Sequence, residues 1–163
     1  MARAAIDIPT FWRAIGVRAI GYSIVTAQDS AGPAGFLALS ATHLSACPPT
    51  TMVSIDLKTS ALNTVRNSRH FAINYLAQGS ESLVETFSGK GPLKGPKRFG
   101  ADLWTTLSTG APILKDSIGA LDCVLEETIE RHGSVIAIGL LVDFVLHDVR
   151  KPLISFAGRT LTF

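Results

Sequence analysis

The strongest constraint on the fold comes from two long runs in the C-terminal half of the chain. Residues 117–129 and 134–146 alternate well enough between apolar and polar side chains to be strands. Only a short turn, Arg131-His132-Gly133, lies between them. Two strands joined by so short a turn form a hairpin, and hairpin strands pair antiparallel. The chain is therefore predicted to be built around an antiparallel sheet.

The rest of the chain adds shorter strands and a few short helices without a regular strand–helix–strand alternation. This pattern argues against a parallel dinucleotide-binding sheet and predicts a mainly β protein with an antiparallel, closed or partly closed barrel. Thr10 is expected to cap the first helix, and the Gly- and Pro-rich residues 89–100 are expected to be a loop. The further strands are predicted at 19–27, 36–46, 51–57, 70–76, 104–107, 112–114 and 153–156, and the helices at 9–17, 60–68 and 80–88.

Composition limits the classes of function. With 163 residues the chain is expected to be a single domain over 1–163, and 47% hydrophobic residues give it a large core and an apolar surplus that a homodimer could cover. A net charge of +2 argues against nucleic acid as a partner. No run reaches the roughly 18 apolar residues of a membrane span, so a cytoplasmic protein is expected. Cys47 and Cys123 have no metal-site spacing and are expected to be buried, reduced thiols.

Residues 32–60, GPAGFLALSATHLSACPPTTMVSIDLKTS, carry the strongest functional signal. Small side chains let a flat molecule approach the backbone, and exposed N–H and hydroxyl groups can hold an anion. A flat ring joined to a phosphate describes a flavin mononucleotide. The alternative is an ordinary β segment that happens to be rich in Ser, Thr and Ala.

The chain resembles the flavin reductase-like family of FMN-binding split barrels. The resemblance covers residues from about 11 to 159, and its order and spacing carry it more than any single piece. It implies a homodimeric split barrel that passes a hydride from NADH or NADPH to FMN, or FAD, and supplies reduced flavin to a partner monooxygenase. The pieces are residues 32–66, FAINYL at 71–76, FSG at 87–89, KRF at 97–99, GAPIL at 110–114, IGLLVD at 138–143 and PLISFAGR at 152–159.

The resemblance also assigns roles to individual residues. One segment is expected to run along the flavin ring, a second to surround the ribityl chain and phosphate, and an arginine from a distant turn to reach the phosphate. Asp56 is expected either to be a flavin neighbour or to be a hydrogen-bonded carboxylate at a strand end. The ring segment is Leu37, Ala38, Leu39, Ser40 and Ala41; the tail segment includes Ile55, Asp56, Lys58, Thr59 and Ser60; the distant turn holds Arg98 and Phe99.

The chain departs from its relatives at several of these positions. Leu37 and Leu39 replace hydroxyl residues, so the pocket is expected to be more apolar than usual. Ser134 stands where reductases often carry a histidine, and His132 lies two residues earlier, so both are candidate nicotinamide contacts. Two alternatives stay open: a flavin- or haem-binding protein without nicotinamide turnover, and a flavoprotein reductase for another acceptor such as a corrinoid.

Overall fold

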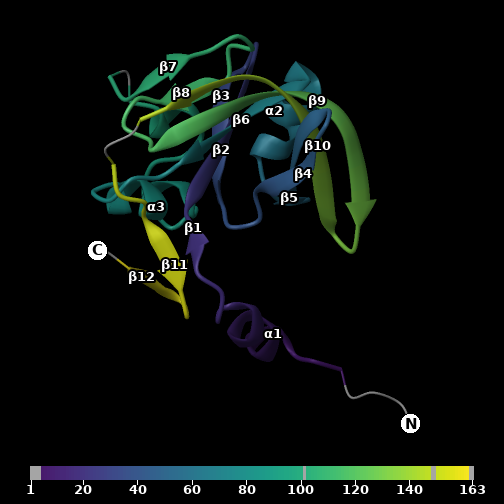
Figure 1. The fold of residues 1–163 in the computed structure, drawn as a ribbon, viewed down its shortest axis with the longest axis vertical. Coiled ribbons are helices and arrows are strands. Elements are labelled where there is room, and N and C mark those ends of the chain that lie inside the picture. Colours follow the sequence, from purple (N-terminus) through teal and green to yellow (C-terminus); the bar gives the residue numbers. More distant parts are fainter. Residues whose placement is uncertain (1–4, 101, 148–149, 162–163) are drawn as a thin grey trace.

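The protein is a split β-barrel with a small lobe made from both ends of the chain (Figure 1). The computed structural model describes residues 5–100, 102–147 and 150–161. The helices are α1 (Ile8–Ile15), α2 (Ala61–Ser68), α3 (Glu81–Phe87) and the 3-10 helix η1 (Gly95–Arg98). The strands are β1 (Ile20–Gly21), β2 (Ser23–Asp29), β3 (Gly32–Ala38), β4 (Thr42–Ala46), β5 (Pro49–Asp56), β6 (His70–Tyr75), β7 (Trp104–Thr106), β8 (Pro112–Leu114), β9 (Gly119–Arg131), β10 (Ser134–Leu146), β11 (Ile154–Phe156) and β12 (Arg159–Leu161).

Seven antiparallel strands form the barrel in the order β3-β2-β6-β9-β10-β5-β4. The long hairpin β9–β10 supplies its centre, as predicted, and curves around the core (Figure 1). β3 and β4 are the two edges of this sheet, although only residues 39–41 separate them in sequence. We call the opening between these edges the split. The prediction of one strand over 36–46 is wrong because the chain crosses there from one edge to the other.

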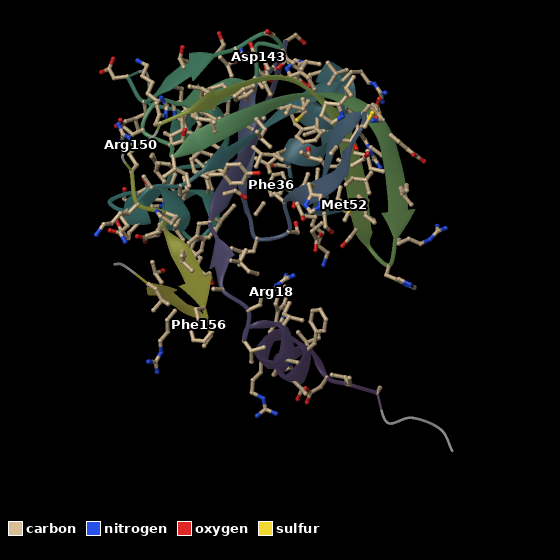
Figure 2. All side chains as sticks on the ribbon, in the orientation of Figure 1. Arg18, Phe36, Met52, Asp143, Arg150 and Phe156 are labelled. Carbon is tan, nitrogen blue, oxygen red and sulfur yellow. The ribbon has the colours of Figure 1, made fainter. Side chains whose placement is uncertain are left out.

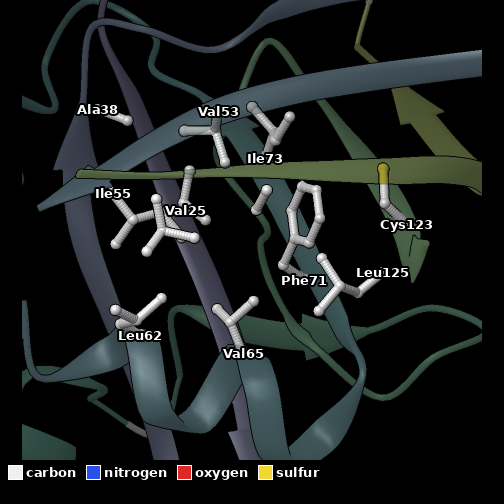
Figure 3. Packing of buried hydrophobic residues seen from close by; sticks show 13 residues of the cluster. Val25, Ala38, Val53, Ile55, Leu62, Val65, Phe71, Ile73, Cys123 and Leu125 are labelled. Carbon is white, nitrogen blue, oxygen red and sulfur yellow. The ribbon is translucent and has the colours of Figure 1, made fainter. Parts of the chain in front are cut away.

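The barrel interior is filled with apolar side chains, and α2 contributes Leu62 and Val65 to it (Figure 3). Phe71 is fully buried at its centre. A Cβ at Gly139 would lie 2.6 Å from Cζ of Phe71, so the ring occupies the space that only a glycine leaves open. Close packing of this kind makes the barrel the rigid part of the molecule.

The two ends of the chain form a separate unit, here called the terminal lobe, made of α1, β1, β11 and β12. β1 pairs with β11, and the Ala157 amide donates to the Gly16 carbonyl over 2.8 Å. In Figure 1 the lobe projects from one side of the barrel. The prediction of a single strand over 19–27 is corrected, since Ile20–Gly21 belong to the lobe and Ser23–Asp29 to the barrel.

Three further predictions need correction. The N-cap of α1 is Asp7, whose Oδ1 accepts from the Thr10 amide over 2.8 Å, so Thr10 is capped rather than capping. Residues 89–100 contain η1, because Pro96 fixes the backbone angle at the start of a helical turn. Cys47 is exposed in the turn between two strands, whereas Cys123 is buried as expected. Within the described residues, no helix is long and apolar enough to cross a membrane.

Candidate functional site

A cavity of about 640 Å³ lies where the split of the barrel meets the terminal lobe. The barrel contributes the end of β3 and residues of β5 and β10, and the lobe contributes α1 and the β11–β12 turn. Most of the wall is apolar, and polar side chains gather on the β5 and β10 side. The cavity is lined by Phe11, Trp12, Ile15, Gly16, Arg18, Ile20, Phe36, Leu37, Ala38, Leu39, Ser40, Ser54, Asp56, Thr59, Ser134, Ser155 and Gly158.

The predicted ring segment forms one wall of this cavity. Leu37, Ala38, Leu39 and Ser40 all line it, while Ala41 packs against the barrel core instead. β3 is an edge strand bonded to β2 on one side only, so alternate backbone N–H and C=O groups on its other side stay available. The segment therefore offers backbone donors and acceptors beside apolar side chains, which is what a flat heterocyclic ring requires.

The Ser40 hydroxyl ties the end of β3 to β5 across the split. Its Oγ donates to the Ser54 carbonyl over 3.2 Å and accepts from the Ser54 amide over 3.2 Å. With both bonds formed inside the protein, this hydroxyl fixes the shape of the cavity wall. Ser40 can accordingly offer a ligand its backbone groups and the remaining lone pair of Oγ, but not its hydroxyl proton.

The predicted tail segment divides between the cavity and its surroundings. Asp56 and Thr59 line the cavity, whereas the Ile55 side chain is buried in the barrel core. Asp56 Oδ1 accepts from the Lys58 amide over 2.8 Å, and the Thr59 amide donates to the Asp56 carbonyl over 2.9 Å. Asp56 is thus a hydrogen-bonded carboxylate at a strand end, one of the two expected roles, and it also lines the cavity, so its contact with a flavin stays a prediction.

This turn leads directly into α2 and carries exposed polar side chains next to the start of that helix. Ser60 is the N-cap of α2, and within the described part of the chain its side chain makes no capping hydrogen bond. Lys58 and Ser60 are exposed beside the cavity rather than among the described residues that line it. A helix N-terminus with hydroxyls and an ammonium beside it suits an anion such as a phosphate.

The distant turn lies elsewhere. The Arg98 guanidinium stacks over the Phe87 ring, with Cζ 5.2 Å from the ring centroid, and burial lowers its pKa. Phe99 packs against Phe87 and Trp104 at centroid distances of 5.3 and 4.9 Å, close to Gly35 on β3. Neither residue is among the described residues that line the 640 Å³ cavity.

One of the two candidate nicotinamide contacts lies in the turn of the long hairpin, and the other is the first residue of the strand that follows. Ser134 lines the cavity and is the cross-strand partner of Asp56. His132 is exposed in that turn, with a φ of +49°. The structure thus brings Ser134, and not His132, into contact with the cavity.

The terminal lobe contributes most of the cavity residues that the sequence did not predict, and the barrel adds Phe36 and Ser54. Phe11, Trp12 and Arg18 come from the N-terminal end, and Ser155 and Gly158 from the C-terminal end. The sequence did contain a signal for Phe11 and Trp12, because an apolar helix face is predicted by the spacing of Ile8, Phe11, Trp12 and Ile15. Ser155 and Gly158 could not be predicted in this way, because their place beside the cavity depends on the pairing of β1 with β11.

The size and the polar groups of the cavity fit a flavin. Its volume lies within the roughly 300–1,000 Å³ typical of ligand pockets, and an apolar wall with a polar end matches a flat ring that carries a phosphorylated chain. Across residues 5–100, 102–147 and 150–161, no group of three or more His, Cys, Asp and Glu could hold a metal ion.

Comparison with known proteins agrees with this geometry. The model of the flavin reductase like domain family matches residues 18–162. An FMN reductase (NADH) RutF from Agrobacterium fabrum is 35% identical over 137 residues, which cover 84% of this chain and 78% of the relative.

Solved structures share the fold. Flavin reductase PheA2 superposes with a TM-score of 0.86 at 25% identity, covering 97% of this chain and 99% of that chain. BorF, the flavin reductase component of a bacterial two-component tryptophan halogenase, superposes with a TM-score of 0.88 at 21% identity, covering 95% and 97%, and shows the common fold alone. The split barrel, the cavity at its opening and the match over residues 18–162 lead to one conclusion: this chain belongs to the flavin reductase-like domain family.

Proposed function

We propose that this protein is an NADH-dependent FMN reductase. The observation that carries the proposal is the cavity at the split, where the backbone edge of β3 and the polar β5–α2 turn form parts of one wall. When bound there, FMN supplies a ring that accepts a hydride; the hydride from NADH and one proton from solvent yield reduced flavin and NAD⁺. The chain itself has to bind and orient the two rings.

The protein's own groups contribute binding, orientation and charge stabilisation. Within residues 37–40, the backbone N–H groups that do not pair with β2 are proposed to donate to the electron-rich edge of a reduced ring. The side chains of Phe36, Leu37 and Leu39 limit access of water to that ring. Ser134, across from Asp56, is the proposed hydroxyl contact to the nicotinamide, and His132 is a contact only after a change in the hairpin turn.

The phosphate is proposed to bind at the start of α2. Thr59, Ser60 and Lys58 supply two hydroxyls and an ammonium next to the first amides of that helix. Arg98 and Phe99 stay predictions of the family resemblance, because the guanidinium is stacked on Phe87. Comparing FMN affinity of Arg98→Gln and Lys58→Gln tests which cation matters; we expect the Lys58 change to weaken binding more.

A homodimer is proposed on the basis of exposed apolar side chains. Val142, Phe144 and Leu146 alternate along one face of β10 and are 44%, 57% and 64% exposed. A row of this kind on a soluble barrel is typical of a surface that another subunit covers. A monooxygenase that consumes the reduced flavin is the proposed further partner.

Anaerobic titration of the purified protein tests the proposal. With FMN or FAD present, NADH or NADPH should bleach the visible absorbance of the oxidised flavin, and the pair of nucleotide and flavin that gives the fastest bleaching defines the activity. A protein that binds flavin but is not bleached by either nucleotide would be a carrier rather than a reductase. A protein that binds no flavin would overturn the proposal altogether.

A further inference from the structure

The helix α1 presents an apolar face that the folded chain leaves uncovered. Ile8, Phe11, Trp12 and Ile15 share one side of the helix, yet α1, all of whose residues the structure describes, buries none of them. Phe11 is 48% and Trp12 60% exposed. A helix face of this composition normally packs against a core. Because this face is uncovered, we examine the space beside it for a ligand.

The space beside it is the cavity of the proposed active site. Phe11, Trp12 and Ile15 all line that cavity, on the side of the terminal lobe. The wall on the barrel side is the β3 segment that is proposed to hold the flavin. The residues that line the cavity come from both α1 and the barrel, and Figure 1 shows these two parts apart from each other.

The chemistry of the α1 wall suits a second planar ring. The Phe11 and Trp12 rings meet edge to face, with centroids 5.4 Å apart and planes at 67°, so together they present both an aromatic face and an edge. Hydride transfer requires the nicotinamide ring to stack on the flavin. With the flavin against β3, the next layer toward α1 is the place for that ring.

Arg18 adds a cation at the same end of the cavity. It lines the cavity, is exposed, and lies in the space between α1 and the barrel (Figure 2). A guanidinium can donate two hydrogen bonds to one phosphate group. NADH carries its pyrophosphate one ribose away from the nicotinamide ring, so the aromatic pair and Arg18 match two neighbouring groups of one ligand.

We propose that Phe11 and Trp12 hold the nicotinamide ring of NADH against the flavin and that Arg18 binds the pyrophosphate. This inference rests on the proposed function for the place of the flavin. The helix lies outside residues 18–162, so the family match does not supply the assignment of Phe11 and Trp12, whereas Arg18 is the first matched residue. These are positioning residues, and the chain recruits them from a segment that adds little to the stability of the barrel.

Equilibrium binding tests the proposal without turnover. Apoprotein is titrated with FMN by flavin fluorescence, and the FMN-loaded protein is then titrated with NAD⁺. We expect Trp12→Ala to raise the Kd for NAD⁺ about tenfold, since stacking on an aromatic side chain contributes about 1–3 kcal/mol and each 1.4 kcal/mol is a factor of ten. The Kd for FMN and the Tm should stay unchanged, and Trp12→Phe should retain most NAD⁺ binding.

A pair of arginine variants provides the matched control. Arg18→Gln should raise the Kd for NAD⁺ severalfold, with a smaller effect at high salt. Arg13→Gln removes the same charge from α1 at a position outside the cavity lining and should change nothing. If both Arg18→Gln and Trp12→Ala bind NAD⁺ like the wild type, the proposal is wrong.

Two other results would also overturn it. Loss of FMN or FAD affinity in Trp12→Ala, with NAD⁺ binding intact, would assign α1 to the flavin or its adenine. An FMN-loaded wild type that binds no NAD⁺ would leave the α1 wall without its proposed ligand. By contrast, a wild type that binds both molecules but never oxidises NADH would contradict the proposed reductase activity and leave this subsite standing.

Discussion

The closed side of the barrel, formed by the central strands β6, β9 and β10, and its open side, where the split meets the terminal lobe, differ in how their side chains are packed. On the closed side, Phe71 and Cys123 are cross-strand partners with no exposed surface, and Gly139 leaves room for the ring (Figure 3). On the open side, α1 buries no residue, and the turn after β4 exposes Cys47. The chain thus concentrates stability in one region and keeps apolar surface available for ligands in the other.

Truncating one apolar side chain on each side is the strongest test of this difference in packing. Phe71→Ala should lower the free energy of unfolding by about 3–5 kcal/mol, because it removes a fully buried ring and leaves a cavity. Ile8→Ala, at a side chain 73% exposed, should change it by less than about 0.5 kcal/mol. Urea denaturation followed by fluorescence measures both, and equal losses would refute the contrast.

A second test uses the two cysteines and alkaline pH. Burial raises the pKa of the Cys123 thiol from 9.0 to about 11. Between these values the unfolded chain loses a proton that the folded chain keeps, so stability falls as pH rises, by at most about 3 kcal/mol at 1.4 kcal/mol per unit. Cys123→Ala should flatten this fall, whereas Cys47→Ala, the control on the open side, should keep the wild-type slope.

Stability at acid pH tests a hydrogen-bonded carboxylate, Asp143, on the outer surface of the closed side. The Ser108 hydroxyl, at 2.6 Å, and then the Phe144 amide lower the pKa of Asp143. A lowered value means that this contribution is present above the unfolded pKa near 3.8 and is lost as pH falls through the folded value. Asp143→Asn and Ser108→Ala should each lose less stability on acidification than the wild type; a steeper loss in either would contradict the assignment.

The smallest expected effect on stability comes from labelling the thiols. In the native protein Ellman's reagent should modify Cys47 quickly and Cys123 only after unfolding. Labelled protein should keep its unfolding free energy within about 0.5 kcal/mol, because Cys47 contributes nothing to the core. Rapid reaction of Cys123 in the native state would show that the closed side opens more easily than its packing indicates.

Most of the barrel could be predicted from the sequence because its strands are defined locally. The hairpin at 119–146 and the strand at 70–75 carry their own alternation and turn residues. The edge crossing at 39–41 and β12 escaped prediction. Which strands become edges depends on pairing across the whole sheet, and Arg159–Leu161 contains a single apolar residue, too little pattern to predict a strand.

The site shows the same division. Leu37 to Ser40, Asp56, Thr59 and Ser134 lie together as the family resemblance implied, because all of them belong to the barrel. Trp12 and Ser155 join them only through the terminal lobe, whose register no local pattern reveals. Arg98 stays apart because its guanidinium has a stacking partner in Phe87 that the sequence could not identify.

The pairing of β1 with β11 also sets an order of events during synthesis. Phe11 and Trp12 leave the ribosome early, but Ser155 and Gly158 emerge only after the whole barrel has been made. At about 5–20 residues per second the wall stays incomplete for several seconds after α1 appears. The complete cavity, with walls from both the barrel and the terminal lobe, therefore exists only in the finished protein.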